Sequence, residues 1–522
     1  MVISGSLCGR GAYLLQQSSM LDSYLLAVLL MLPLVGAISR CTISANATYT
    51  VRNRCLLTTR LTLLCSLRMW NNYIQDSRTP FQQVVGFSIS WNGYINIGLE
   101  FGVDALSLWM VLLTCAIFPL SVLCSWNLNT LIIKPFRILL LVLETSLLAA
   151  FTCVDLLGFY VLYESALLPM FLLINLGGSR PRKVRAAYLL VLYTLVGSLV
   201  RLPCVLIMFL QTGSTSRELL VAQNWTPEVQ RVRFWGLFLA FAVKVPRMPV
   251  HLWLPEAHVE ASTAGSVLLA GVLLKLGTYG FLRFRFPLLP TATIYYGPLV
   301  WTRCLIAVVY ASLTTLRQVD LKKLVAYSSV AHRNLLVLGL FTRSDIGFAG
   351  GTFLRMAHGI SSPALFLCVG ALYDRAHTKA LKYLGGAATT MPIFSIRFFF
   401  FSLCNRALPL TPNFVAEFTV LCSIFSRNVT ALIVSLIGVI RSAAYTRWAY
   451  ARVVHGMPKF WAMNVWADLN RRETHCFIPL VALALWWGLK PARILDMLTA
   501  TGWYWQSTAR PLDMPNWVNL AL

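Results

Sequence analysis

The stretch Phe241–Phe284 reads FAVKVPRMPVHLWLPEAHVEASTAGSVLLAGVLLKLGTYGFLRF, and it holds two lysines in hydrophobic surroundings. Lys244 is followed by two prolines, and Lys275 stands near the middle of the apolar segment that comes next. At the helical rise per residue, the Cα atom of Lys275 lies roughly 12 Å from the nearer end of that segment, whereas its side chain reaches only about 6 Å. The ammonium group of Lys275 cannot reach water at either end, so the sequence predicts a buried cation.

The composition of the whole chain is that of a membrane protein. Of its 522 residues, 57% are hydrophobic and 12% are charged, whereas soluble domains carry about 25% charged residues. Several apolar runs, such as 105–125, 136–154 and 156–175, are long enough to cross about 30 Å of hydrocarbon. We count about fourteen such runs, and we expect an all-α polytopic membrane protein without a large soluble domain.

The net charge of +25 comes mainly from Lys and Arg residues that lie between the apolar runs. A nucleic-acid-binding face would instead gather them on one soluble surface, so no nucleic-acid partner is expected. Three loops are especially basic, namely SRPRKVR (179–185), LRQVDLKK (316–323) and DRAHTKALK (374–382). The positive-inside rule places these loops on one side of the membrane, and the helix count places both termini on the other.

Motifs for cofactors are absent from the sequence. The thirteen cysteines include no C-x-x-C pair, and neither G-x-G-x-x-G nor a Walker A motif occurs. Iron–sulfur and zinc sites need clustered thiolates, and nucleotide sites need such glycine-rich loops. We therefore expect no metal or cofactor on this chain. The amino-terminal residues also lack the basic start and small-residue ending of a cleaved signal, so none is expected.

Two apolar segments are interrupted by prolines next to an ionisable residue. Lys244 is followed by Pro246 and Pro249, and Glu417 follows two further prolines. Proline removes a backbone donor, and in hydrocarbon the freed groups must find partners in protein or water. Interrupted helices in matching places of two halves point to the ion path of a transporter. We therefore predict two five-helix repeats, with the breaks on the seventh and twelfth helices.

This interpretation divides the chain into five parts. They are a divergent region with helices 1 and 2 (1–100), helix 3 and a loop (101–135), a first repeat of helices 4 to 8 (136–285), a second repeat of helices 9 to 13 (286–452), and a loop, helix 14 and an amphipathic tail (453–522). The tail is rich in tryptophan, which suits a position at the level of the lipid headgroups.

The expected membrane helices contain a short set of ionisable side chains, namely Glu144, Glu164, Lys244, Lys275, His332, His358 and Glu417. A charged side chain at a helix centre costs about 2.5 to 3.5 kcal/mol on insertion scales, so several of them together cost about as much as the net stability of a domain. We interpret the acids and lysines as functional, with a structural buried ion pair as the alternative. For each histidine, a hydrogen bond to a neighbouring helix explains the residue equally well.

Desolvation and a neighbouring carboxylate act in opposite directions on the proton affinity of a buried lysine. A glutamate that approaches or leaves such a lysine therefore switches its protonation, and histidines titrate near neutral pH. A row of these groups bridged by water forms a proton relay. We exclude His251, Glu256, His258 and Glu260 from it, because they lie in or beside the loop between the seventh and eighth helices, where we expect exposure to solvent.

Several motifs together resemble a known family. They are YESALLPMFLL (163–173), WLPEAHVEASTAGSVLLAGVLLKLGTYGFLR (253–283), MAHGISSPALFLCVGALYDR (356–375) and PNFVAEF (412–418). The chain is similar to the antiporter-like subunits in the membrane arm of respiratory complex I, the proton-pumping NADH-quinone oxidoreductase, and among them to the subunit 4 branch. These subunits resemble those of multi-component sodium/proton antiporters and membrane-bound hydrogenases.

The resemblance implies fourteen helices in two inverted five-helix repeats. It gives places in a proton relay to Glu164, Lys244, Lys275, His332, His358 and Glu417. A glutamate at position 417, rather than a lysine, favours subunit 4 over its sister subunits 2 and 5, and so does a chain expected to end soon after its last helix. We add Glu144 to the relay because it is an ionisable residue in an expected membrane helix. It lies near one end of that helix, so packing against a neighbouring chain is the alternative.

By the same resemblance, flavin, iron–sulfur clusters and the ubiquinone site belong to other subunits, and quinone reduction there drives proton conduction in this chain. The expected partners are the antiporter-like subunits 2 and 5 and phospholipids, in the mitochondrial inner membrane. Two alternatives stay open. The chain could be a subunit of a multi-component sodium/proton antiporter, or a structural membrane scaffold whose buried ion pairs conduct nothing.

Several positions depart from this family, which usually has proline at Ser262 and apolar residues at Arg247, Arg333 and Arg355. It also has Gly-Thr-Ser where this chain has LTP (410–412) before Asn413. An arginine directly after His332 could perturb the central axis or face a partner subunit, and it could also reflect a transcript that is edited before translation. We expect most of the extra arginines to face headgroups or neighbouring chains. An Arg333 that lies on the axis without a carboxylate partner would contradict this expectation.

Overall fold

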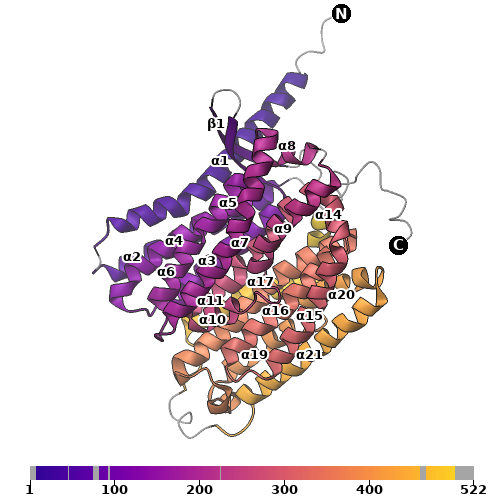
Figure 1. Ribbon diagram of the computed structural model, residues 1–522. Coiled ribbons are helices and arrows are strands. Elements are labelled where there is room, and N and C mark those ends of the chain that lie inside the picture. The colour runs from indigo at the N-terminus through magenta and orange to yellow at the C-terminus, as the bar shows by residue number, and fades with distance from the viewer. Residues whose placement is uncertain are drawn as a thin grey trace, which may run out of the picture.

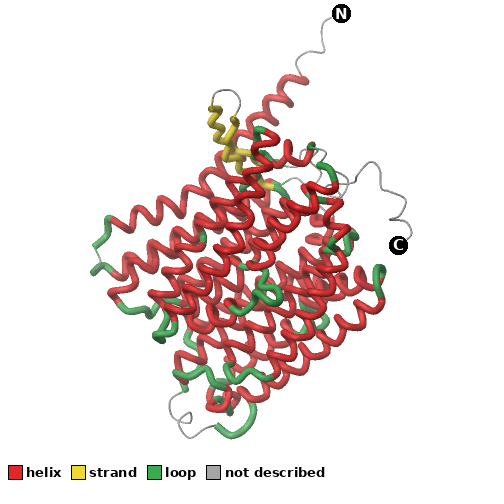
Figure 2. The backbone as a smooth tube through the Cα atoms, viewed as in Figure 1, coloured by secondary structure: helices red, strands yellow, loops and turns green. Residues whose placement is uncertain are grey.

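The structure is a computed structural model that describes residues 7–44, 46–73, 81–91, 95–223, 225–458 and 466–499. Its helices run alongside one another in one bundle (Figure 1), and a two-stranded hairpin stands at one end of that bundle (Figure 2). The tryptophan-rich tail beyond residue 499 lies outside the described residues.

Helices make up nearly all of the described chain. In chain order the elements are α1 (Leu7–Cys41), α2 (Thr48–Asn72), β1 (Gln83–Trp91), β2 (Ile95–Val103), α3 (Ala105–Cys124), α4 (Thr130–Thr152), α5 (Leu156–Ser165), α6 (Leu167–Gly177), α7 (Lys183–Thr212), α8 (Arg217–Ala222), α9 (Pro227–Lys244), α10 (Trp253–Glu260), α11 (Thr263–Leu268), η1 (Leu269–Leu273), α12 (Lys275–Gly280), η2 (Phe281–Arg285), α13 (Phe286–Leu288), α14 (Pro290–Tyr295), α15 (Gly297–Leu316), α16 (Leu321–Leu340), α17 (Asp345–Ala376), η3 (Leu381–Tyr383), α18 (Ala387–Thr390), α19 (Pro392–Asn405), α20 (Pro412–Phe425), α21 (Val429–Val454) and α22 (Arg471–Leu489). Of these, η1 and η2 are π-helical turns and η3 is a 3-10 turn.

Eight of the described helices are long and apolar enough to cross a membrane, or nine if the bent pair Arg471–Leu489 and Ala492–Thr499 forms one span. The number of spans is smaller than the number of apolar runs in the sequence, which is about fourteen. Part of the difference arises because α19 and α20 are shorter than a span and because α16 carries several charged side chains. The prediction of a helical, multi-pass membrane protein is confirmed at this coarser level.

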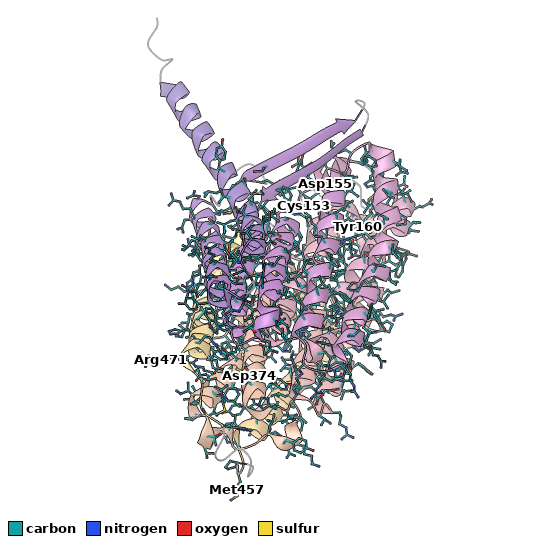
Figure 3. The ribbon with its side chains drawn as sticks, turned by 90° about the vertical axis from the view of Figure 1, so that its left-hand side faces the viewer. Cys153, Asp155, Tyr160, Asp374, Met457 and Arg471 are labelled. Carbon is teal, nitrogen blue, oxygen red and sulfur yellow. The ribbon has the colours of Figure 1, made fainter. Side chains whose placement is uncertain are left out.

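The three basic loops meet at the same end of the bundle, which we call the basic end. Ser179 Oγ lies 3.1 Å from the hydroxyl oxygen of Tyr373, and the amide of Leu321 donates to the carbonyl of Lys379 at 2.9 Å. Figure 3 shows Asp374 toward this end, away from the strands at the opposite end. α1 begins on the side of the strands (Figure 1). The arrangement agrees with basic loops on one side and the start of the chain on the other.

The hairpin of β1 and β2 differs from the all-α chain that we expected. Gln83 pairs with Val103 in an antiparallel register, and the amide of Val154 donates to the carbonyl of Glu100 at 2.9 Å, which fastens β2 to the end of α4. The sequences VVGFSIS and INIG are rich in β-branched and aromatic residues, which favour strands. The all-α expectation is therefore wrong for this segment.

The segment Thr263–Leu288 forms the centre of the bundle, and all of its residues except Thr263 and Phe286 are buried. It runs through α11, α12 and α13, with the π-helical turns η1 and η2 between them. Helices at the periphery expose apolar side chains instead, such as Leu210 on α7 and Ile440 on α21. An apolar periphery around a sealed centre suits a protein surrounded by lipid, where only the interior offers partners for polar groups.

A buried ion pair fastens the central segment to the start of α3. Nη1 of Arg283 lies 2.6 Å from Oδ2 of Asp104, and Nε of Arg283 donates to the hydroxyl of Tyr279 at 3.0 Å. Asp104 also caps α3, because its carboxylate accepts the amide of Ser107 at 2.8 Å. Removing one partner of such a pair leaves an uncompensated buried charge.

The substitution Asp104→Asn tests this pair. Asparagine keeps a side-chain oxygen for the cap but removes the negative charge, so Arg283 loses its counter-ion. We expect the free energy of unfolding to fall by about 3 to 5 kcal/mol, measured by denaturant unfolding of the protein in detergent micelles.

The matched control is Lys323→Met. It breaks the ion pair between Lys323 and Glu256, whose side chains are 30% and 43% exposed. An exposed pair of this kind contributes less than about 1 kcal/mol. Equal losses in the two variants would show that the burial of the Asp104–Arg283 pair carries no special weight.

Candidate functional site

Lys244 ends α9, and the chain then leaves the helical path until Trp253 begins α10. This interruption confirms the break predicted from the two prolines. The indole nitrogen of Trp253 donates to the carbonyl of Val243 at 3.1 Å, and so satisfies a carbonyl near the end of α9 that lacks a partner in its own helix. The ammonium group of Lys244 is buried without a hydrogen-bond partner, and it lies 4.1 Å from the centre of the Tyr163 ring.

Glu164 lies on α5, close to Lys244. Its Oε1 is 3.6 Å from Nη2 of Arg201, which comes from α7, and the guanidinium of Arg201 lies 4.4 Å from the centre of the same Tyr163 ring. The charges that act on Lys244 are those of Glu164 and Arg201. The sequence analysis missed Arg201, although its place in the apolar run LVGSLVRLPCVL was a usable signal.

Lys275 lies directly after the π-helical turn η1. Its ammonium group donates to the carbonyl of Ala270 at 2.7 Å and lies 3.1 Å from Nδ1 of His358 on α17. π-helical turns often occur at functional sites, because they displace side chains from the regular helical register. The predicted burial of Lys275 is confirmed, since only 3% of the residue is exposed.

His358 continues toward two further predicted residues. The centres of the His358 and His332 rings are 5.9 Å apart, and Nδ1 of His332 lies 2.8 Å from Oε1 of Glu417. Glu417 stands in α20, which begins after a turn that separates it from α19, so the second predicted break is also present. We call Lys275, His358, His332 and Glu417 the central row. All four are buried.

Glu144 lies apart from the central row. It is buried in α4 and accepts a hydrogen bond at 2.8 Å from Thr62 of α2, while its other carboxylate oxygen has no hydrogen-bond partner. In the part of the chain that the structure describes, no hydrogen bond or ion pair joins Glu144 to Lys244 or to the central row. The structure therefore places it toward the amino-terminal helices.

We expected the four residues in or beside the loop before the eighth helix to be exposed to solvent. This expectation is wrong for three of them, which are buried. His251, His258 and Glu260 are at most 4% exposed, because α10 is folded back into the bundle rather than into solvent. The ring of His258 stacks on Phe366 at a centre distance of 4.5 Å. Glu256 alone behaves as expected, since its side chain is 43% exposed.

Two lysines of the basic loops close the end of α10. Lys322 donates to the carbonyl of Ala261 and Lys379 to the carbonyl of Val259, each at 2.7 Å. Cations are favoured at the carboxyl end of a helix, where carbonyls lack partners. Both lysines also line a cavity of about 170 Å³ at the basic end, together with Ser262. The sequence predicted only that these lysines lie in basic loops.

Arg333 and Arg355 lie inside the bundle beside the central row, which contradicts our expectation that the extra arginines face headgroups or neighbouring chains. They are at most 3% exposed, and they line a cavity of about 10 Å³ together with Lys275, His332 and His358. None of their guanidinium nitrogens has a hydrogen-bond partner. The physical reason for their position is helical register: each arginine precedes or follows a histidine of the row by one to three residues on the same buried helix.

Arg247 and Arg285 lie in a second buried cluster. Both guanidinium groups face the rings of Phe238, Phe281 and Phe341 at centre distances between 4.5 and 5.6 Å. Their nitrogens also lack hydrogen-bond partners. Four buried guanidinium groups would together cost on the order of 10 kcal/mol on insertion scales, which is about the net stability of a domain.

Metal ligands do not gather in the described residues, where no group of three or more His, Cys, Asp or Glu side chains is placed to hold an ion. Cys124 and Cys476 come nearest to a paired thiol site, with their sulfur atoms 3.9 Å apart. What the geometry offers is therefore a set of buried acids and bases rather than a coordination site.

Comparison with known proteins defines the class of this site. Residues 153–443 match the family model described as NADH:quinone oxidoreductase/Mrp antiporter, TM. In complex I of Thermus thermophilus with bound NADH, one solved chain is similar over 93% of this chain and 100% of its own length, with a TM-score of 0.83 and 27% identity. A chain of the Mrp complex from a Dietzia species shares the fold, with a TM-score of 0.81, 18% identity and coverage of 94% and 100%. The fold is thus that of antiporter-like membrane subunits.

Curated relatives narrow this class. NADH-ubiquinone oxidoreductase chain 4 of Prototheca wickerhamii is 44% identical, covering 93% of this chain and 95% of the relative. The corresponding chains of Marchantia polymorpha and Arabidopsis thaliana are each 45% identical, covering 91% and 95%. The chain belongs to the family of NADH-ubiquinone oxidoreductase chain 4, and it is a membrane subunit of the multi-subunit respiratory complex I.

Gly277 offers a test of how Lys244 and Lys275 are held together. A Cβ atom there would lie 2.8 Å from Cγ2 of Val245 and 3.2 Å from the carbonyl oxygen of Phe241, both beside the end of α9. For Gly277→Ala we expect the free energy of unfolding to fall by about 1 to 3 kcal/mol, because the two lysine-bearing helices must separate. Denaturant unfolding in detergent measures the loss.

Gly297→Ala is the matched control, because a Cβ atom at that position meets nothing within 4 Å. Its effect should stay within a few tenths of a kcal/mol of the unsubstituted protein, or stabilise α15 slightly through the better helix propensity of alanine. A comparable loss in both variants would mean that the close approach at Gly277 is unimportant.

Proposed function

We propose that this chain conducts protons through a relay of the partly exposed Glu164 and the buried Lys244, Lys275, His358, His332 and Glu417, driven by quinone reduction elsewhere in the complex. The observation that carries the proposal is the central row, in which four buried acid–base groups from four helices follow one another. Groups of this kind inside a membrane protein are rare and expensive, and they are typical of proton and ion pathways.

Proton transfer between the members needs contacts within hydrogen-bond reach, about 2.6 to 3.2 Å or one water molecule longer. The contact of Lys275 Nζ with His358 Nδ1 at 3.1 Å and that of His332 Nδ1 with Glu417 Oε1 at 2.8 Å both meet this condition. Each histidine leaves its Nε2 without a hydrogen-bond partner. A water molecule between the two rings, whose centres are 5.9 Å apart, would complete the row.

The other half of the relay is the cluster around Lys244. Glu164 acts on Lys244 electrostatically, and Lys244 has no hydrogen-bond partner that would fix its proton. A shift of the Glu164 carboxylate toward or away from Lys244 therefore changes the proton affinity of the lysine. The close approach at Gly277 holds Lys244 beside the helix of Lys275, so such a change is felt by the central row.

A polar cavity at the basic end supports the proposal. The cavity of about 170 Å³ between α3, α11, α16 and α17 is lined by polar side chains, including Ser262, Lys322 and Lys379. A polar cavity of this volume has room for several water molecules. We place the uptake or release of protons at this cavity.

The same proposal includes the finer architecture. It comprises fourteen helices, with the five-helix repeats of residues 136–285 and 286–452 in inverted orientation, flanked by 1–100, 101–135 and 453–522. The interrupted pairs α9/α10 and α19/α20 support it, because each carries an ionisable side chain next to a break. Glu144 is included as an outlying member of the relay, since it is buried with one free carboxylate oxygen.

Within the complex we place this chain beside the antiporter-like subunits 2 and 5 and phospholipids, in the mitochondrial inner membrane. The eukaryotic source of the curated relatives supports the location. Flavin, iron–sulfur clusters and ubiquinone are assigned to other subunits of the complex, and this chain contributes a non-redox, proton-translocating part of the NADH:ubiquinone reductase.

Lys244→Met and Glu417→Ala test the relay. Methionine and alanine carry no exchangeable side-chain proton, so we expect NADH-driven proton translocation to fall several-fold or to background while the complex still assembles. Acidification of vesicles that contain the purified complex measures translocation, and native gels measure assembly. Lys323→Met, at the exposed basic end, is the control that should leave both unchanged.

Two results would point elsewhere. Normal translocation in an assembled Lys244→Met complex would leave only a structural role for the buried charges. Transport that depends on sodium and proceeds without NADH oxidation would select an antiporter subunit instead.

A further inference from the structure

Four arginines of this chain have neither a hydrogen-bond partner nor a counter-ion for their guanidinium groups. Arg247, Arg285, Arg333 and Arg355 are at most 3% exposed, and all three guanidinium nitrogens of each lack a hydrogen-bond partner. In the part of the chain that the structure describes, no ion pair includes any of the four. Each therefore combines full burial with a complete lack of polar partners.

Other buried arginines of the same chain have polar partners for their guanidinium groups. Arg137 is fully buried and donates to the carbonyls of Val122 and Ser125 at 2.9 and 2.8 Å. Arg283 is fully buried and pairs with Asp104. The arginines with partners and the four without them are buried to a similar extent, so they differ only in their polar contacts. Arg283 and Arg285 show this difference within two positions of the sequence.

Neither a neighbouring subunit nor a bound anion can supply the missing partner. A side chain of another subunit cannot reach groups that expose at most 3% of their surface. The cavity beside Arg333 and Arg355 has a volume of about 10 Å³, which is at the lower limit for one water molecule, so it has no room for chloride or phosphate. Around Arg247 and Arg285 the contacts are phenylalanine rings.

The four guanidinium groups also cannot become neutral by losing a proton. A buried lysine becomes neutral when the surroundings reject its charge, but arginine stays protonated in proteins. Two permanent cations beside Lys275 would also oppose any proton that arrives there. Burial, missing partners and fixed charge together are incompatible with arginine at these positions.

We infer that the mature protein carries uncharged, apolar side chains at positions 247, 285, 333 and 355, because the codons read as arginine are expressed as another residue in this organism. An unbranched side chain of similar length fits best. Methionine has such a chain, and its sulfur makes favourable contacts with aromatic rings like those around positions 247 and 285. The inference is independent of the proton relay, since it rests on burial and partners alone.

Protein sequencing by mass spectrometry tests the inference directly. Complex I purified from the native membranes is denatured and digested with chymotrypsin, whose cleavage does not depend on arginine, and the fragments are sequenced. We expect an uncharged residue at 247, 285, 333 and 355, and arginine at the control positions Arg137 and Arg283. A parallel trypsin digest should cut after Arg283 and leave the bond after position 285 intact.

Recovery of arginine at any of the four positions would overturn the inference. Sequencing of the gene and its transcript from the same cells separates the two routes that agree with it. A transcript that differs from the gene at these codons identifies editing, whereas an unchanged transcript with a different peptide identifies a changed reading of the codon.

Discussion

The constraint on which the structure depends is the cost of a charge that has left water. In the central segment Thr263–Leu288, the buried Lys275 meets that cost by donating to a backbone carbonyl and by contacting His358. Arg283 meets it with Asp104. These partners come from α17 and from the start of α3, so both elements must pack against the central segment. The same contacts therefore determine the packing of the bundle and the chemistry of its interior.

This constraint also separates residues that can serve in proton transfer from residues that cannot. A lysine or histidine in a poorly solvated place exchanges its charge for a lone pair, and it thereby gains the ability to accept a proton again. A guanidinium has no such second state. The central row contains only groups that have both a charged and a neutral form, its glutamate included, whereas the arginines beside it have only the charged form.

Much of the fold could be predicted from local chemistry. The apolar runs gave the helices, the prolines after Lys244 and before Glu417 gave the two breaks, and the distance of Lys275 from either end of its segment gave its burial. The basic loops gave the common end at which they meet. Each of these follows from composition or spacing along one short stretch, without knowledge of what packs against it.

What could not be predicted depends on contacts between distant segments. The burial of His258 and Glu260 follows from the direction in which the chain turns after Lys244, which the prolines permit but do not set. Lys322 looked like an ordinary loop cation until the end of α10 was placed beside it. The hairpin was not predicted because each strand is too short to stand out in composition, and the two are stabilised by pairing with each other.

The pairing of Asp104 with Arg283 has an electrical consequence. The two charges cancel, so an electric field across the membrane exerts no net force on the pair, whereas an isolated charge gains about 2.3 kcal/mol per 100 mV if it crosses the whole potential. Because the pair joins α3 to the central segment, these two elements feel no net pull through it when the membrane is energised. The pair therefore fixes this junction without adding a charge on which the membrane potential acts, whereas a proton moving through the interior is a mobile charge.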